Sequence, residues 1–329
     1  MPFRSHDAEQ DEHLREPVAR FFALDAALEP TRGMFGDRSA QRFAAASLVL
    51  VPGEPAQIAT QLRETAKQFQ QLMPWRVGFA PQLHLMFAVA LVRHDDTPDA
   101  LLDETKRVRK IMRALGLRWA PVYEFIAVLV MRTLGDGAPI SDEQVQRMRD
   151  IYEAMKQHHW VLTGPEDFPA CALLTTRAGT PQQLAQYAHD IYEGLRAGGR
   201  GRGDPLQTAS NLLAMLASDH LPAPALSERF LALVSAFEHA GQKIAASEYD
   251  EVALLCFLSR PVPAIVETVA AYKQALGADI RWFEGDYAFG FATNLAFVQL
   301  VGGDPELGPI ADFKSLLDMY SILLQNGGG

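Results

Sequence analysis

The six residues DIYEAM at positions 150–155 return as DIYEGL at positions 190–195, in the same order after a step of forty residues. Apolar residues accompany each tyrosine, Tyr152 and Tyr192, at the three- and four-residue spacing that lines one face of a helix. The two sets are Val145, Met148 and Met155, and Ala185, Ala188 and Leu195. The chain therefore contains at least two copies of one amphipathic helix.

The aromatic series continues beyond these two copies. From Tyr192 it is 45 residues to Phe237 and a further 35 residues to Tyr272. Repeats of roughly 35 to 45 residues are typical of helical-hairpin arrays, in which each unit buries its apolar face only against its neighbours. The spacing thus predicts a repeat protein built from helical hairpins.

Two kinds of helix alternate along the sequence. Further amphipathic helices are expected at 55–72, 97–115, 223–240 and 263–276. Shorter segments between them are apolar almost all round and therefore require cover on most sides, and they lie at 83–92, 122–131, 168–176, 206–217, 251–259 and 287–300. Alternating apolar and β-branched strand patterns are nearly absent. The prediction is an all-α fold of six or seven hairpins, either an open α-solenoid-like array or one that curves toward a closed α/α ring.

The expected organisation has three parts. Residues 1–15 are polar and acidic and are expected to form a flexible tail, residues 16–325 a single helical-repeat domain, and residues 326–329 a flexible C-terminus. Capping boxes are expected at Ser141–Gln144, Thr163–Glu166 and Thr180–Gln183, because the first and fourth side chains of such a box satisfy two backbone amides reciprocally.

Composition narrows the classes of function. The 329 residues carry a formal net charge of −10, which disfavours nucleic acid and anionic membranes as partners. No apolar run is long enough to span a membrane, and Cys171 and Cys256 each lie in apolar surroundings that suit buried free thiols. These features predict a cytoplasmic protein. The Gly-rich stretch at 196–204 lacks the preceding strand of a nucleotide-binding loop, so no cofactor is expected.

The four tryptophans share one position in the repeat. Trp75, Trp119, Trp160 and Trp282 all lie in the connection that leads from an amphipathic helix to the next apolar one. In a regular array such connections lie along one edge. Each tryptophan either fills the seam between hairpins or contributes to an aromatic groove. Neither the histidines beside Trp160 nor the acidic residues after it follow a zinc-site spacing, and no metal site or catalytic residue is predicted.

The stretches at 155–174 and 198–216 resemble an uncharacterised bacterial family, domain of unknown function 4003. The first run consists of His159, Trp160, Leu162, Thr163, Glu166, Asp167 and Phe168, and the second of Leu206, Gln207, Ser210 and Leu213. The resemblance implies no reaction. It singles out His159, Glu166, Asp167, Gln207 and Ser210 as positions of interest.

These observations give one candidate binding set, at the edge where the connections meet. The set is His159, Trp160, Glu166, Asp167, Gln207, Ser210, Trp119 and Trp282. Aromatic walls with a few polar groups suit a ligand or a peptide backbone. The leading hypothesis is a scaffold that binds a protein or peptide segment. The alternative is an enzyme or small-ligand receptor with a pocket at the same edge. Under either hypothesis, stacking of consecutive repeats is expected to bring Gln207 close to the loop that follows His159.

Overall fold

The computed structural model describes residues 17–31, 38–73, 81–159, 163–201, 203–216, 221–277 and 288–301. These residues contain fourteen α-helices and no strand, so the predicted all-α class is confirmed. The tails expected at 1–15 and 326–329 lie outside the described residues. Within the described part of the chain, no helix is both long and apolar enough to span a membrane.

The chain divides into two compact units. The first unit comprises residues 1–72, 78–98 and 267–329, and the second comprises residues 73–77 and 99–266. The single helical-repeat domain expected over residues 16–325 stays a prediction, and each unit is described by itself.

In the first unit, α2 packs against α3 and α4, α4 packs against α5, and α3 packs against α5 and α15. The bounds are α2 (Pro17–Leu28), α3 (Arg38–Ser47), α4 (Pro55–Leu72), α5 (Pro81–Arg93) and α15 (Ala288–Val301), with a 3-10 turn, η1 (Glu29–Thr31), after α2. Helix α14 (Val262–Gly277) begins in the second unit and ends in the first. The apolar segment 83–92 lies in α5, and residues 288–300 of the segment 287–300 lie in α15. The described side chains of both helices are almost all buried, as their all-round apolar character predicts.

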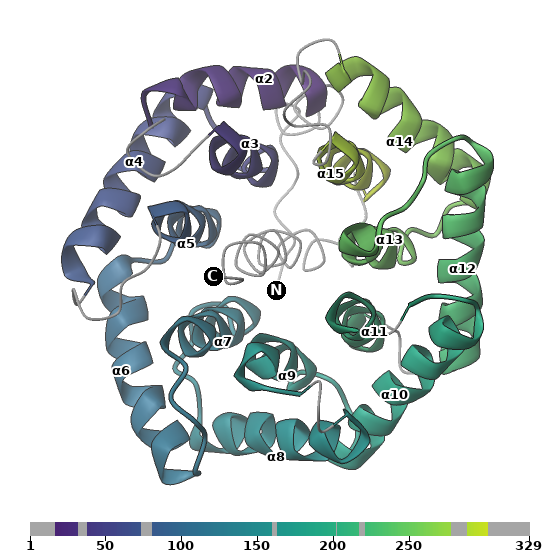
Figure 1. Cartoon of the computed structure of the whole chain (residues 1–329). Coiled ribbons are helices and arrows are strands. Elements are labelled where there is room, and N and C mark those ends of the chain that lie inside the picture. The colour runs from purple at the N-terminus through teal and green to yellow at the C-terminus, as the bar shows by residue number, and fades with distance from the viewer. Residues whose placement is uncertain are drawn as a thin grey trace, which may run out of the picture. The chain divides into compact units, whose positions relative to one another are not determined.

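The second unit has two layers of helices (Figure 1). One layer holds the amphipathic helices α6 (Pro98–Ala114), α8 (Asp142–His159), α10 (Pro181–Ala197) and α12 (Ala223–His239). The other, which we call the inner layer, holds α7 (Pro121–Leu134), α9 (Phe168–Leu174), α11 (Asp204–Leu216) and α13 (Tyr249–Leu255), with the 3-10 turns η2 (Pro165–Asp167) and η3 (Ala246–Glu248) before α9 and α13. Within these layers, α7 packs on α9, α9 on α11, α11 on α13, α8 on α10, and α10 on α12.

The repeated DIYE stretch occupies equivalent positions in α8 and α10. Tyr152 and Tyr192 are both buried, and the Tyr152 ring packs edge-on against Phe168 of α9 with ring centroids 5.1 Å apart. The copies differ after the glutamate, where Ala154 is matched by Gly194. A Cβ atom on Gly194 would come within 2.9 Å of the Cβ atom of Ser227 in α12. The glycine therefore lets α10 and α12 approach closely.

In several hairpins, an arginine of one helix binds the backbone carbonyls of a turn that follows a neighbouring helix, and we call this contact the arginine clamp. Arg147 of α8 donates hydrogen bonds to the carbonyls of Thr175, Arg177 and Gly179 at 3.0, 2.6 and 2.9 Å, where the chain leaves α9 for α10. Arg229 of α12 and Arg20 of α2 contact three alternate carbonyls of the corresponding turns in the same way, at Cys256, Leu258 and Arg260, and at Val49, Val51 and Gly53. Forty residues after Arg147, Tyr187 donates instead to the Leu221 carbonyl at 2.6 Å.

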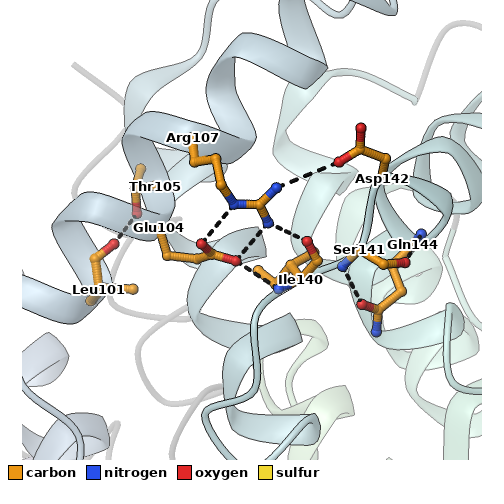
Figure 2. Close-up of polar contacts among 8 residues, drawn as sticks. All are labelled: Leu101, Glu104, Thr105, Arg107, Ile140, Ser141, Asp142 and Gln144. Atoms are coloured by element: carbon orange, nitrogen blue, oxygen red, sulfur yellow. Dashed lines mark hydrogen bonds and ion pairs between the residues drawn. The ribbon is translucent and has the colours of Figure 1, made fainter.

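In the hairpin formed by α6 and α7, an ion pair serves the same purpose (Figure 2). Glu104 accepts hydrogen bonds from the Ile140 amide at 2.6 Å and from Arg107, and Arg107 also donates to the Ile140 carbonyl. The turn continues into the capping box of Ser141 and Gln144, which is confirmed, as is the box of Thr180 and Gln183 at the start of α10. Each clamp fixes the turn that begins the next repeat.

Candidate functional site

The described part of the predicted binding set lies in the second unit, on the connections and on the inner layer. Glu166 and Asp167 belong to η2, Gln207 and Ser210 to α11, and Trp119 to the connection between α6 and α7. Trp160, Trp282 and the side chain of His159 lie outside the described residues.

Asp167 and Gln207 are in direct contact, as the stacking of consecutive repeats predicts. The Gln207 Nε2 atom donates a hydrogen bond of 3.0 Å to Asp167 Oδ1, which joins η2 to α11. Asp167 is 5% exposed and Gln207 is 4% exposed. A carboxylate and an amide from neighbouring hairpins thus form a buried polar contact. We group with them Gly164, the adjacent Thr163, and Asn211, which lies one turn after Gln207 on α11, and call these five residues the Asp167 cluster.

The residues just before Asp167 determine the turn on which it lies. Gly164 is extended, and Pro165 suits the first position of a helical turn. The Gly164 amide donates to Asp167 Oδ2 at 3.1 Å, so Asp167 is the side chain that satisfies the start of η2. The capping box predicted from Thr163 and Glu166 is therefore wrong by one residue. Within the described part of the chain, the Thr163 hydroxyl has no hydrogen-bond partner, and the Glu166 carboxylate lies over Gly164 at a place that a Cβ atom would occupy.

Three polar atoms of the cluster are buried without a hydrogen-bond partner among the residues that the structure describes. They are Thr163 Oγ1, Gln207 Oε1 and Asn211 Nδ2, from side chains that are 7%, 4% and 5% exposed. Leaving such an atom unsatisfied costs about 1–3 kcal/mol, and most buried polar groups have partners. Ser210, also predicted for the site, is different, because its hydroxyl donates to the Leu206 carbonyl of its own helix at 2.7 Å.

The electrostatics of the cluster centre on Asp167. Burial raises the pKa of this carboxyl to about 7, against an ordinary value of 3.8. Hydrogen bonds from Gly164 and Gln207 oppose that rise, whereas the acidic side chains of Glu166 and Asp204 add to it. The carboxyl group is therefore close to half protonated near neutral pH.

Two tyrosines face the same charges. Burial raises the pKa of Tyr123 in α7, and Glu166 and Asp167 raise it further. Burial likewise raises the pKa of Tyr152 to about 12, with smaller contributions from neighbours that include Asp167. Both phenols therefore stay neutral at physiological pH and lie within electrostatic range of the buried carboxyl group.

Trp119 is 67% exposed. Its ring has the guanidinium carbons of Arg109 and Arg113 each 5.3 Å from its centroid. Both arginines form ion pairs with Glu124, whose side chain is fully buried. The Arg109 Nε and Glu124 Oε2 atoms are 2.7 Å apart but lack the alignment of a hydrogen bond, so we regard this contact as purely ionic. Burial lowers the pKa of Arg109 to about 10, which leaves it charged at neutral pH.

From the sequence alone, Asn211 was not identified near Gln207, nor were Arg109, Arg113 and Glu124 near Trp119. Asn211 follows Gln207 by four positions and could have been found as a second polar residue on an apolar helix face. Arg109 and Arg113 are likewise four apart on α6, but nothing in their spacing points to Glu124. Among the described residues, no group of three or more histidine, cysteine, aspartate or glutamate side chains is arranged to hold a metal ion.

Comparison with known proteins places the chain among proteins of unassigned function. A family model described as a protein of unknown function (DUF4003) matches residues 82–301, more than half of the chain. The range includes both stretches that carry the resemblance, which is thereby confirmed. The chain is also 29% identical over 147 residues to the uncharacterized protein YeaA of Bacillus subtilis (strain 168), covering 43% of this chain and 42% of that relative, less than half its length. No solved structure matches the chain.

Proposed function

The chain belongs to the DUF4003 family, and from the geometry of the Asp167 cluster we propose that it is a helical-repeat protein that binds a polar ligand there. Consecutive packing of hairpins within the second unit supports an α-solenoid-like array as the scaffold. This reading favours the small-ligand alternative over the peptide scaffold, because the polar residues of the cluster are buried rather than displayed on an edge.

One observation carries the proposal. The amide of Gln207 uses its nitrogen to bond Asp167 and leaves its oxygen unpaired, although the side chain is almost fully buried. Thr163 and Asn211 add two further unpaired polar atoms to the same cluster. A ligand that hydrogen-bonds these atoms removes their desolvation cost, which gives the free energy for binding and also its selectivity.

The test uses small molecules retained by the purified protein. The protein is incubated with an ultrafiltrate of bacterial metabolites and washed, and the compounds released on denaturation are identified by mass spectrometry. We expect a compound retained by the wild type and lost from Gln207→Met, which keeps the side-chain volume but removes the amide. Thr105→Val is the matched control, because Thr105 is buried and its hydroxyl donates to the Leu101 carbonyl of its own helix at 2.7 Å.

Retention of nothing by a folded wild type, or equal retention by Gln207→Met, would refute the proposal and would indicate that water satisfies these polar atoms. Circular dichroism at 222 nm confirms that each variant keeps its helices.

A protein or peptide segment is the second candidate ligand, at the exposed face of Trp119. Tryptophan and arginine are enriched among the residues that dominate binding energy at interfaces, and the two arginines hold the indole in place. Arg109, Arg113 and the adjacent exposed Arg118 outnumber Glu124, so an acidic segment suits this surface. A glutamate-rich peptide should bind the wild type but not Trp119→Ala, and a lysine-rich peptide of equal length should bind neither. Equal binding of both peptides would exclude this candidate.

A further inference from the structure

We propose that the ligand of the Asp167 cluster carries a protonated amine, and that Asp167, Gln207 and Thr163 accept hydrogen bonds from its ammonium group. The inference rests on the proposed function of the cluster and specifies the chemical class of its ligand.

Two of the unpaired atoms of the cluster, Gln207 Oε1 and Thr163 Oγ1, are acceptors that match the donors of an ammonium group, whereas Asn211 Nδ2 is a donor and takes no part in this match. Such a group has three N–H donors and no acceptor. The cluster offers acceptors from three side chains, namely the Asp167 carboxylate, the Gln207 carbonyl oxygen and the Thr163 hydroxyl, and the last two are unpaired. Gln207 is tied to Asp167 through its own nitrogen at 3.0 Å, and Thr163 directly precedes Gly164, whose amide bonds Asp167 at 3.1 Å. All three side chains are more than nine-tenths buried.

The charge around Asp167 also favours a cation. Its hydrogen-bond partners, Gly164 and Gln207, are neutral, and the charged residues that act on it, Glu166 and Asp204, are acidic. Within the described residues, Asp167 forms no ion pair with a basic side chain. A buried carboxylate without a cation either takes up a proton or binds a positively charged ligand.

Aromatic rings nearby suit the same ligand. Tyr123 and Tyr152 both lie within electrostatic range of Asp167, and the Tyr152 ring already has the Lys156 ammonium 5.2 Å from its centroid. Aromatic faces stabilise cations by about 0.5–2 kcal/mol. A transition metal ion is a poorer match, because the described residues hold no group of three or more histidine, cysteine, aspartate or glutamate side chains that could bind it.

Binding of an amine displaces the proton of Asp167. The titratable groups that face this carboxyl are Glu166 on its own turn, Tyr123 from α7, Tyr152 from α8, Cys171 from α9 and Asp204 from α11. Burial raises the pKa of the Cys171 thiol well above its usual range, so both tyrosines and this thiol stay neutral. When the carboxylic acid form meets an ammonium ion, an ammonium–carboxylate pair forms and one proton is released to solvent. Affinity should therefore rise with pH until Asp167 is ionised in the free protein.

The experiment compares three probes that share one carbon chain and differ in charge: n-butylammonium, n-butanol and butyrate. Binding to the full chain is measured by isothermal titration calorimetry from pH 5 to pH 8, in two buffers of different ionisation enthalpy so that proton release is counted. Potassium chloride is a fourth probe, since it supplies a monovalent cation without N–H donors. The proteins are the wild type, Asp167→Asn, and Thr105→Val as the matched control.

We expect n-butylammonium alone to bind. Its affinity should rise on the order of 10²-fold from pH 5 to pH 8, as follows from a carboxyl that titrates near pH 7, with nearly one proton released per amine at the lower pH. Asp167→Asn should lose at least tenfold in affinity at pH 8 and lose the pH dependence, whereas Thr105→Val should match the wild type.

Three results overturn the inference. Preference for butanol or butyrate would exclude an ammonium ligand while leaving a polar-ligand site intact. Binding of potassium in place of the amine would show that charge alone is recognised. Absence of all binding to a folded wild type would also reject the amine, and the metabolite-retention experiment then decides separately whether the cluster binds any ligand.

Discussion

Replacing Asp167 with asparagine should make the protein more stable at alkaline pH. The side chains have nearly the same shape, and both hydrogen bonds of Asp167 survive the change. The asparagine oxygen accepts from the Gly164 amide, and its nitrogen donates to the Gln207 oxygen once that amide rotates by half a turn. What the substitution removes is the ability to ionise in a buried site.

The magnitude follows from the two pKa values of the carboxyl. The pKa is about 7 in the folded protein, mainly because of burial, against an ordinary value of 3.8. The folded state holds the proton more tightly, so the group favours folding most below pH 4, and this contribution is lost as the pH rises to about 7. Between pH 5 and pH 8 the loss amounts to roughly 3 kcal/mol in the free energy of unfolding. The Asp167→Asn variant should not lose this stability as the pH rises, because an amide side chain does not ionise.

Urea denaturation followed by circular dichroism at 222 nm measures the effect, at pH 5 and at pH 8, for the wild type and the variant. The difference between the two proteins should grow by roughly 3 kcal/mol in favour of the variant as the pH rises. Gln183→Glu, at the exposed cap of α10, controls for general effects of charge at a helix start. A variant that is equally destabilised at both pH values would show that Asp167 is ionised and needed in the fold, which refutes the argument from burial.

Three further substitutions test the packing of the repeats. Gly194→Ala should destabilise the protein by about 1–3 kcal/mol, because the new methyl group meets Ser227, and Gly194→Ala combined with Ser227→Ala should recover most of the loss in the same urea assay. Arg147→Met should lower stability by about 2–3 kcal/mol by removing three hydrogen bonds to carbonyls, whereas a loss no larger than that of Tyr187→Phe would show that the arginine clamp contributes little. Glu124→Gln should cost about 3 kcal/mol, because Arg109 and Arg113 then lack a counter-charge. The same substitution should change the fluorescence of Trp119. An unchanged melting temperature would mean that water compensates Arg109 and Arg113 for the loss of their counter-charge.

The fold class was predictable because it depends on periodicity. Tyr152, Tyr192, Phe237 and Tyr272 are spaced as hairpins require, and each is buried on a helix of the amphipathic series. The helix start predicted at Thr163 was wrong, since Thr163 and Glu166 have the same spacing as Gly164 and Asp167, and spacing alone does not choose between them. The choice depends on the backbone of Gly164 and on Pro165, which begins the turn at the next position.

The site was predictable only in part, because a polar residue on an apolar helix gives no indication of its partner. Gln207 and Asp167 were expected to lie close together on the strength of the repeat alone, and they do. The roles of Tyr123 and Asn211 depend on how the inner helices of consecutive hairpins face one another. The pKa of Asp167 likewise depends on burial by neighbouring elements. These are tertiary properties with no local sequence signal.

The forty-residue step gives a structural reason for the position of the proposed site. At the start of three inner helices an acidic side chain accepts a hydrogen bond from a preceding amide: Glu124 from Ala120, Asp167 from Gly164, and Glu248 from Ala245. In the hairpin between the last two, forty residues after Asp167, the corresponding position holds Gln207, which reaches back to Asp167 instead. At this position an uncharged amide stands where the other hairpins have a carboxylate. An amide has an acceptor as well as donors, and because the Gln207 nitrogen donates to Asp167, the Gln207 carbonyl oxygen remains unpaired among the described residues. The proposed ligand site therefore lies where this series of carboxylates is interrupted by an amide, at the seam where two repeats meet.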